Sequence, residues 1–449
     1  MTRSQRLVLV VSILASFVAF LDSSVVNVAL PAISRELGGS LVIQQWVVDA
    51  YLITLGSLIL LAGSLSDLFG RRRILTAGLI GFGMASLLCA VAPSSLFLIF
   101  ARAVQGIAGA LLVPSSLALI MSSFSGEQQS KAIGRWTAWT GISFIVGPLV
   151  GGFLVDSSSW RLVFAINIVP IACCLWLLRM VAAPSQTTHA KLDVIGALLC
   201  SAGLAATVFG LIEQPHLGWG SGIIVASLAV GLFALLTFVW YEAHTSTPML
   251  PLSLFTIRNF ATGNFATLSI YGGLSVATFL IIIYLQQVAG YSAFLAGLAL
   301  LPVTIVMFLL SPRFGAWSST YGVRLFMTAG PCVAGIGFLL MLRIGTHMHY
   351  WSQLFPGTLV FALGLSMTVA PLTAAVLRDV AVQRSGIASA VNNAVSRIAG
   401  LIMVALAGVI VGPHLDRAGL RKAIITTAVL LVCGGVVSWF GIRDREAVH

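Results

Sequence analysis

Charged residues are scarce in this 449-residue sequence. Asp, Glu, Lys and Arg together make up 8% of the chain, whereas a soluble domain carries about 25%. Acidic residues are rarer than basic ones, with 13 in all and none between Glu242 and Asp379. This shortage excludes an ordinary soluble protein, which would need polar surfaces around two or three domains at this length.

The residues that build disulfide frameworks, metal sites and catalytic sites are also few. The six cysteines all lie within apolar segments and lack paired spacing, which favours small buried hydrophobic side chains over disulfides or metal ligands. The loops contain no paired catalytic acids and no Ser/His/Asp set. We therefore expect no enzyme, no metal and no cofactor. The net charge of +11 would indicate nucleic-acid binding in a soluble protein, but here we expect it to reflect basic cytoplasmic loops.

Long apolar runs are what the sequence has instead, and 59% of its residues are hydrophobic. A helix that crosses a bilayer needs about 20 apolar residues, and its backbone bonds internally. The sequence therefore predicts an all-α polytopic membrane protein. We predict fourteen spans, near residues 7–30, 41–65, 74–93, 96–122, 132–155, 160–182, 193–213, 219–241, 260–289, 293–312, 325–345, 351–377, 386–411 and 421–441.

The distribution of basic residues predicts the orientation of these spans. Because fourteen is even, both termini lie on one side. That side receives sixteen of the 24 Lys and Arg residues, the other side receives six, and two lie inside spans. The positive-inside rule then predicts cytoplasmic N- and C-termini.

Two acidic residues, Asp22 and Asp49, lie clearly inside predicted spans. Such charges are costly and often mark ion pathways. From the predicted outer ends of their spans, Asp22 lies ~12 Å deep and Arg102 ~10 Å deep, so the two can pair. The pair is either a fixed bracket between helices or a carboxylate whose proton affinity changes when Arg102 moves away.

The second membrane-embedded arginine, Arg397, has no acid near it in the sequence. We expect it to bond backbone carbonyls or Asn392 and Asn393, which lie one to two helical turns earlier. A structural bracket and a contact with substrate remain equally open for Arg397.

Glycines are concentrated in two parts of the sequence. Gly141, Gly147, Gly151 and Gly152 crowd the fifth predicted span around Pro148, where small residues permit close helix approach and proline favours a kink. This pattern is either ordinary tight packing or a bendable contact between helices that slide.

The second place is a loop that occurs twice. The loops at 63–73 and 315–324 share glycines seven residues apart and an arginine two residues after the second glycine. Asp67 in the first loop corresponds to Ser319 in the second. This faint repeat is typical of transporters built from duplicated bundles.

Several stretches together resemble the major facilitator superfamily, and most closely its fourteen-span drug:proton antiporters, the group of the quaternary ammonium exporters. The resemblance covers nearly the whole chain. It rests on Leu21–Pro31, Gly63–Arg73, Arg102–Gly109, Gly141–Gly152, Trp160–Asn167 and Tyr284–Ser292.

The resemblance implies the major facilitator fold, with six-helix bundles at 1–183 and 251–449 and two additional helices and linkers at 184–250. It implies a proton-coupled antiporter that exports small amphipathic or cationic organic compounds by alternating access, as in multidrug efflux. The alternative is a dedicated exporter of one endogenous metabolite, antibiotic or lipid. The expected partners are small molecules, protons and the lipid bilayer of the cell membrane, without nucleic acid, and we expect a monomer.

The resemblance also assigns roles to residues. Asp22 and Arg102 are expected to couple protons. Asp67 is expected to steady the outward-open state against the second bundle, near the start of the thirteenth span. The expected substrate-binding residues are Asp49, Asn27, Gln105 and Arg397. The expected gating motifs contain Gly63, Asp67, Gly70, Arg71, Arg72, Gly147, Pro148, Gly151 and Gly152. The missing acid at Ser319 and the absence of a membrane acid in the second bundle argue against a symmetric gate and against export of divalent cations.

Overall fold

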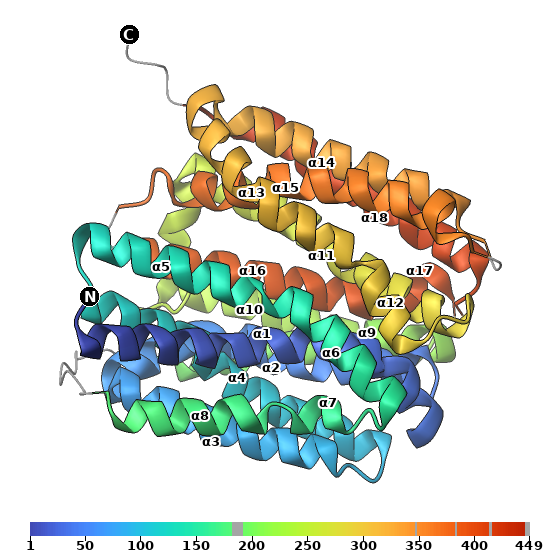
Figure 1. The fold of residues 1–449 in the computed structure, drawn as a ribbon, viewed down its shortest axis with the longest axis horizontal. Coiled ribbons are helices and arrows are strands. Elements are labelled where there is room, and N and C mark those ends of the chain that lie inside the picture. Colours follow the sequence, from blue (N-terminus) through green and yellow to red (C-terminus); the bar gives the residue numbers. More distant parts are fainter. Residues whose placement is uncertain (182–191, 346–347, 382–383, 413–414, 445–449) are drawn as a thin grey trace. The chain divides into compact units, whose positions relative to one another are not determined.

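The computed structural model describes residues 1–181, 192–345, 348–381, 384–412 and 415–444 (Figure 1). Within these residues, fourteen helical segments are long and apolar enough to cross a membrane. They match the fourteen predicted spans one for one, so the predicted all-α polytopic fold is confirmed. The predicted boundary at 183/184 lies outside the described residues.

The chain divides into two compact units. Unit 1 contains residues 1–207, 226–249 and 292–294, and unit 2 contains residues 208–225, 250–291 and 295–449. The first eight spans comprise α1 (Arg3–Leu37), α2 (Leu41–Phe69), α3 (Arg71–Ala90), α4 (Ser95–Ser123), α5 (Gly126–Gly141), α6 (Ser143–Ser157), α7 (Leu162–Ala165), α8 (Ile168–Arg179), α9 (Val194–Leu217) and α10 (Gly222–His244). The last six comprise α11 (Arg258–Gln287), α12 (Ala293–Ala299), α13 (Leu301–Tyr321), α14 (Val323–Leu340), α15 (Phe355–Leu377), α16 (Ser385–Ala405), α17 (Ala407–Val411) and α18 (Arg417–Gly441), with short helical turns η1 (Leu252–Thr256), η2 (Met341–Arg343) and η3 (Tyr350–Leu354).

Helix α1 is the centre of unit 1, where it packs against α2, α4, α5, α6 and α8. Its N-terminus is fixed by a capping box in which the Thr2 and Gln5 side chains each bond the other's backbone N–H. Ser40 and Ser94 cap α2 and α4 in the same way, by accepting a backbone N–H. These caps satisfy donors that the helix itself leaves unpaired.

Helices α11, α14, α15 and α18 form the closely packed part of unit 2. Glycines set the contact between α14 and α15, since a Cβ atom on Gly337 would overlap the backbone of Phe361 and one on Gly364 would overlap the backbone of Ala334. Side chains larger than hydrogen would separate these two helices. Small residues at helix interfaces serve this purpose in membranes, where no hydrophobic force drives helices together.

The fifth and sixth spans are interrupted helices. The fifth breaks at Ile142, between α5 and α6, so the interruption precedes Pro148, which lies within α6. The sixth breaks at Ile166 and Asn167, between α7 and α8. The backbone angles of these three residues remain helical, and the hydrogen bonds from Ile145 to Ile142 and from Asn167 to Phe164 show that each interruption is a local tightening of the helix.

The two repeated loops have the same backbone turn. Gly70 joins α2 to α3 with φ 94° and ψ 128°, and Gly322 joins α13 to α14 with φ 93° and ψ 141°. Positive φ angles of this size favour glycine because it has no Cβ atom. The shared turn supports the internal repeat inferred from the sequence.

Candidate functional site

The predicted pair of Asp22 and Arg102 is present in unit 1. Arg102 Nη1 lies 2.6 Å from Asp22 Oδ2, and the two side chains are 2% and 0% exposed. Asp22 lies in the middle of α1 and Arg102 in the second turn of α4. The ion pair that the sequence suggested is therefore present in the structure.

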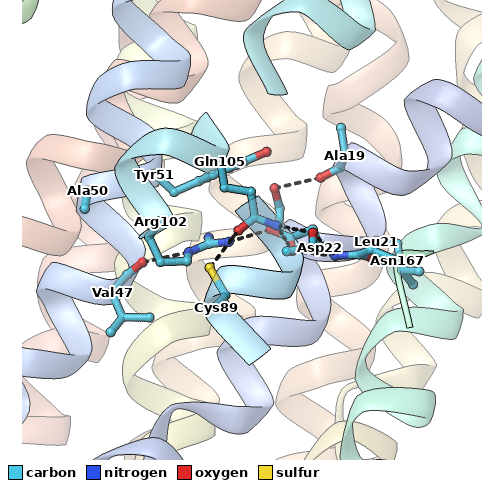
Figure 2. Close-up of polar contacts among 12 residues, drawn as sticks. Ala19, Leu21, Asp22, Val47, Ala50, Tyr51, Cys89, Arg102, Gln105 and Asn167 are labelled. Atoms are coloured by element: carbon cyan, nitrogen blue, oxygen red, sulfur yellow. Dashed lines mark hydrogen bonds and ion pairs between the residues drawn. The ribbon is translucent and has the colours of Figure 1, made fainter. Parts of the chain in front are cut away.

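Two amides hold the other carboxylate oxygen of Asp22 (Figure 2). Gln105 Nε2 donates to Asp22 Oδ1 over 2.8 Å, and Asn167 Nδ2 donates to the same oxygen over 2.9 Å. Both amides also reach Ser86 Oγ on α3, at 2.9 and 3.3 Å. Helices α1, α3 and α4 and the break in the sixth span thus meet around one carboxylate.

Arg102 has partners besides Asp22. Its Nε donates to the carbonyl oxygen of Val47 over 3.1 Å and its Nη1 to Gln105 Oε1 over 2.6 Å. Its guanidinium carbon lies 4.3 Å from the ring centre of Tyr51 and 5.7 Å from that of Phe164. A cation over aromatic faces is stabilised by the ring quadrupole, so the charge is surrounded by favourable contacts.

Such a network is what a buried ion pair requires. Removing two charges from water costs several kcal/mol per ion, and their attraction offsets this only when the remaining donors and acceptors are bonded. Here three donors reach the two Asp22 oxygens, which suits an ionised carboxylate. The donors fill both acceptor positions of Oδ1 and one of Oδ2, so a proton would bind at the remaining position of Oδ2 and remove the negative charge that attracts Arg102.

Asp49 lies in α2 and is fully buried. Neither of its carboxylate oxygens has a hydrogen-bond partner within the described part of the chain. Orphaned buried oxygens are uncommon and costly. Asp49 is therefore an acidic site with unused acceptor capacity, separate in its bonding from the network of Asp22.

The other predicted substrate residues lie in different surroundings. Asn27 is partly exposed on α1 and donates weakly to the Ser23 carbonyl over 3.4 Å. Gln105, predicted to bind substrate, donates to Asp22. In unit 2, Arg397 is close enough to Tyr271 for an electrostatic interaction.

The two neighbours proposed for Arg397 form hydrogen bonds with other residues. Asn392 donates to Asn264 Oδ1 and Thr267 Oγ1 on α11, at 3.2 and 2.8 Å. The carbonyl of Asn393 accepts from Ser396. The sequence prediction singled out these amides as candidate partners for Arg397, and the structure ties Asn392 to α11.

The first repeated loop carries the predicted gating residues. Asp67 lies in the last turn of α2 and pairs with Arg71 at the start of α3, with 3.3 Å between Oδ1 and Nη2. Both side chains are about a third or more exposed to the surroundings. Arg72 donates to the carbonyl of Arg179 over 3.4 Å, and a Cβ atom on Gly63 would meet nothing within 4 Å.

The glycines of the fifth span define a close contact between α6 and α1. A Cβ atom on Gly147 would coincide with Ser24 Oγ, and one on Gly151 would overlap the Val25 side chain. Ser24 also donates to the Ser143 carbonyl over 3.1 Å. Gly152 contacts residues 293 and 294, whereas Gly141 has nothing within 4 Å of its Cβ position. This contact between α1 and α6 lies one turn or less from Asp22.

Sequence reasoning missed the roles of Asn167 and Ser86. Asn167 ends the Trp160–Asn167 motif, so the sequence contained a signal for it, but it was not predicted to belong to a site. Its side chain reaches Asp22 from the sixth span, and hydropathy does not show which face of that span packs against α1. Ser86 is one serine among many in apolar spans and gave no signal of its own.

Comparison with known proteins places the chain in a family. Residues 12–404 match the Major Facilitator Superfamily, and the chain belongs to this superfamily, which confirms the resemblance seen in its motifs. It is 34% identical over 433 residues to the multidrug resistance protein Stp of Mycobacterium tuberculosis (strain CDC 1551 / Oshkosh), covering 93% of this chain and 79% of that protein.

Two further relatives carry the names of single antibiotics. The chain is 33% identical over 408 residues to the methylenomycin A resistance protein of Bacillus subtilis (strain 168), with 90% and 87% of the two chains covered. It is 34% identical over 415 residues to the puromycin resistance protein pur8 of Streptomyces alboniger, with 89% and 80% covered.

Solved transporters share the fold. A peptide transporter POT in complex with sulfate matches with a TM-score of 0.71 over 96% of this chain and 93% of its own. The xylose transporter XylE from E. coli matches with a TM-score of 0.68 over the full length of both chains. Both are 14% identical in sequence, so they establish the major facilitator fold and nothing more specific.

The bonding around Asp22 predicts non-additive stability effects. Arg102→Ala leaves an uncompensated buried carboxylate and should lower the free energy of unfolding by about 3 kcal/mol or more. Asp22→Ala combined with Arg102→Ala should cost clearly less than the sum of the two single changes. Denaturation of the four proteins in mixed micelles measures this coupling. Additive losses would show that the pair contributes no mutual stabilisation.

The contact between α1 and α6 predicts different outcomes for two glycines of the same span. Gly147→Ala forces α6 away from Ser24 and should destabilise the protein by about 1–3 kcal/mol and slow transport. Gly141→Ala is the matched control, and it should be close to neutral because its Cβ atom meets nothing. Melting temperatures and transport rates of both variants decide the matter. Equal behaviour would mean that close approach at Gly147 is unimportant.

Proposed function

We propose that this transporter is a proton-coupled antiporter that exports small amphipathic or cationic organic compounds by alternating access. The single observation that carries the proposal is a fully buried carboxylate, Asp22, paired with an equally buried Arg102 in the middle of a membrane span. Ionisable residues at such positions are rare in membrane proteins and mark proton or ion pathways.

The coupling follows from the geometry of the Asp22 network. Ionised Asp22 accepts from Arg102, Gln105 and Asn167, and these three donors stabilise the charged form against protonation. A movement that withdraws Arg102 favours proton uptake, and the return of Arg102, which substrate binding favours, promotes proton release. The proton affinity of Asp22 thus becomes a function of conformation, which is the requirement for coupling a proton gradient to transport.

The named relatives support the substrate class. A multidrug resistance protein and resistance proteins for methylenomycin A and puromycin are all about one third identical to this chain over most of its length. Resistance to a compound is readily produced by its removal from the cell. We therefore assign the direction as export across the cell membrane, in exchange for inward-moving protons.

Asp49 is the proposed subsite for a cationic substrate. It is buried, and both of its carboxylate oxygens are without a hydrogen-bond partner in the described residues, so a cation would find an acceptor that is not already in use. Asn27 and Arg397 are proposed as further substrate contacts. Gln105, because of its bonds to Asp22 and Arg102, is proposed to link substrate binding to the proton site.

The remaining parts of the proposal concern architecture. The termini face the cytoplasm on the basis of the positive-inside rule. Two six-helix bundles, at 1–183 and 251–449, open the substrate path alternately to the two sides of the membrane. The pair of helices within 184–250 is additional to these bundles. The loop of Gly63, Asp67, Gly70, Arg71 and Arg72 and the glycines of α6 control this alternation.

A second candidate is an exporter dedicated to one endogenous metabolite, antibiotic or lipid. The relatives named for a single antibiotic favour it. The mechanism would be unchanged and only the substrate range would differ. A resistance screen over dyes, antiseptics and antibiotics in an efflux-deficient host separates the two, since protection against one chemical class would support the dedicated exporter.

Substitution of the proposed proton carrier gives a direct test of the function. Asp22→Asn preserves the size of the side chain but cannot exchange a proton, so it should abolish accumulation of substrate against a gradient while substrate binding survives. Proteoliposomes with an imposed pH gradient measure the first effect and equilibrium binding measures the second. Concentrative transport at the wild-type rate by Asp22→Asn would exclude Asp22 as the carrier.

The charge balance tests the role of Asp49. Exchange of one proton for a monovalent cation moves no net charge, so only the pH gradient drives export, at about 1.4 kcal/mol per pH unit. If Asp49 also titrates, two protons enter per cation and each 100 mV adds about 2.3 kcal/mol. We expect the second case, because two membrane acids are costly to retain for one proton.

Proteoliposomes with potassium and valinomycin set the membrane potential at fixed pH. Wild-type export of a monovalent cation should respond to this potential. Asp49→Asn should either lose cation export or make it independent of the potential, while export of neutral compounds continues. Wild-type cation export that ignores the potential would reduce Asp49 to a binding or packing residue.

A further inference from the structure

The second repeated loop lacks an acid in its own sequence, because Ser319 stands where the first loop has Asp67. The structure of unit 2 brings a carboxylate to this loop from elsewhere in the chain. Asp444 follows the end of α18, and its Oδ1 accepts from the backbone N–H of Val323 over 2.7 Å and that of Arg324 over 3.3 Å. These are the first two residues of α14, directly after the turn at Gly322.

Asp444 therefore occupies the position of a helix cap without being next to the helix in sequence. Gly322 precedes α14 and offers no side chain to cap it. A Cβ atom on Gly322 would lie only 2.5 Å from Asp444 Oδ2, so the glycine leaves room for the carboxylate. The first N–H groups of a helix are unpaired and carry partial positive charge, so an anion stabilises them. Arg378, just after α15, adds an ion pair to Asp444 over 3.5 Å.

The C-terminal end of α18 is capped in turn by residues of α11 and α14. The last carbonyl groups of α18 need donors, and arginines of two other helices supply them. Arg324, in the first turn of α14, donates from Nε to the Trp439 carbonyl over 2.7 Å and lies 4.3 Å from the centre of the Trp439 ring. Arg258, at the start of α11, donates to the Gly441 and Phe440 carbonyls, both over 2.8 Å. Cations at a helix C-terminus are favoured by the helix dipole.

The short segment between α18 and Asp444 is also fixed. Asn259, which is buried on α11, donates to the Arg443 carbonyl over 3.1 Å and accepts from the Arg443 N–H over 2.9 Å. The same Nδ2 reaches Asp379 Oδ2 over 2.7 Å. Asp444 is therefore held in register for α14 by a paired backbone contact at the preceding residue.

We propose that Asp444 supplies from beyond α18 the acid that the α13–α14 loop lacks, and that this reciprocal capping holds α11, α14 and α18 together as one block during transport. Asp444 acts as a positioning residue, since it fixes helix ends and contacts no proposed substrate group. The statement about movement rests on the proposed transport function, whereas the statement about capping does not.

Hydrogen–deuterium exchange of the full-length protein in lipid nanodiscs tests the capping. In Asp444→Ala, the amides of Val323 and Arg324 should exchange at least about fivefold faster, the effect of losing one typical helix cap. Asp444→Asn retains an oxygen acceptor without the charge and should fall between wild type and Asp444→Ala. The matched control is Asp416→Ala, because Asp416 caps the other end of α18 through Gly419 N at 2.6 Å. It should leave exchange at Val323 and Arg324 unchanged.

Transport by the same variants tests the role in movement. Asp444→Ala should lower turnover by roughly fivefold, in line with the lost cap, with substrate affinity unchanged in equilibrium binding. Wild-type exchange at Val323 and Arg324 in Asp444→Ala would overturn the capping. Accelerated exchange with undiminished turnover would overturn the role in movement. If wild type itself failed to couple transport to protons, the proposed function would fail while the exchange result still decided the capping.

Discussion

A buried ion pair between Asp22 and Arg102 sets the requirements that the rest of unit 1 meets. Two charges removed from water are tolerable only when nearly all their hydrogen-bonding groups are satisfied. That condition brings together Gln105 from α4, Asn167 from the break in the sixth span and the Val47 carbonyl from α2. The close approach of α6 to α1 at Gly147 lies beside the same site. The network binds the helices together, and its dependence on charge makes it responsive to a proton.

The two units differ in how they use charge. The membrane acids Asp22 and Asp49 both lie in unit 1, and the sequence between Glu242 and Asp379 contains none. In unit 2, the charged contacts of the Asp444 region lie at helix ends, where Asp444, Arg324 and Arg258 cap α14 and α18. An asymmetric division follows, with proton chemistry assigned to unit 1. Unit 2 then contributes a braced set of helices and the substrate contacts proposed near Arg397.

Much of this arrangement could be predicted from the sequence. Fourteen spans follow from apolar runs alone, and the Asp22–Arg102 pair follows from two similar predicted depths, because helix rise converts sequence distance into depth. The turn shared by Gly70 and Gly322 follows from repeated glycine spacing. These features depend on apolar runs and residue spacing, which can be read directly from the sequence.

What could not be predicted depends on contacts between distant segments. The bond from Gln105 to Asp22 was not predicted, although Gln105 lies three residues after Arg102 and therefore on the same face of α4. Asn167 reaches the site from the sixth span, and hydropathy does not reveal which of its residues faces Asp22. Asp444 caps α14 although more than a hundred residues separate the two in sequence. The repeated loop showed only that Ser319 stands where the first loop has an acid.

The most direct test of the central claim is the release of protons when substrate binds to the purified protein. In weakly buffered detergent solution, saturating the wild-type protein with substrate should release protons and lower the pH measurably, because substrate binding and protonation of Asp22 oppose each other. The account predicts that Asp22→Asn, which still binds substrate, loses this signal. The same proton release from wild type and Asp22→Asn would contradict the assignment of Asp22 as the site that couples protons to transport.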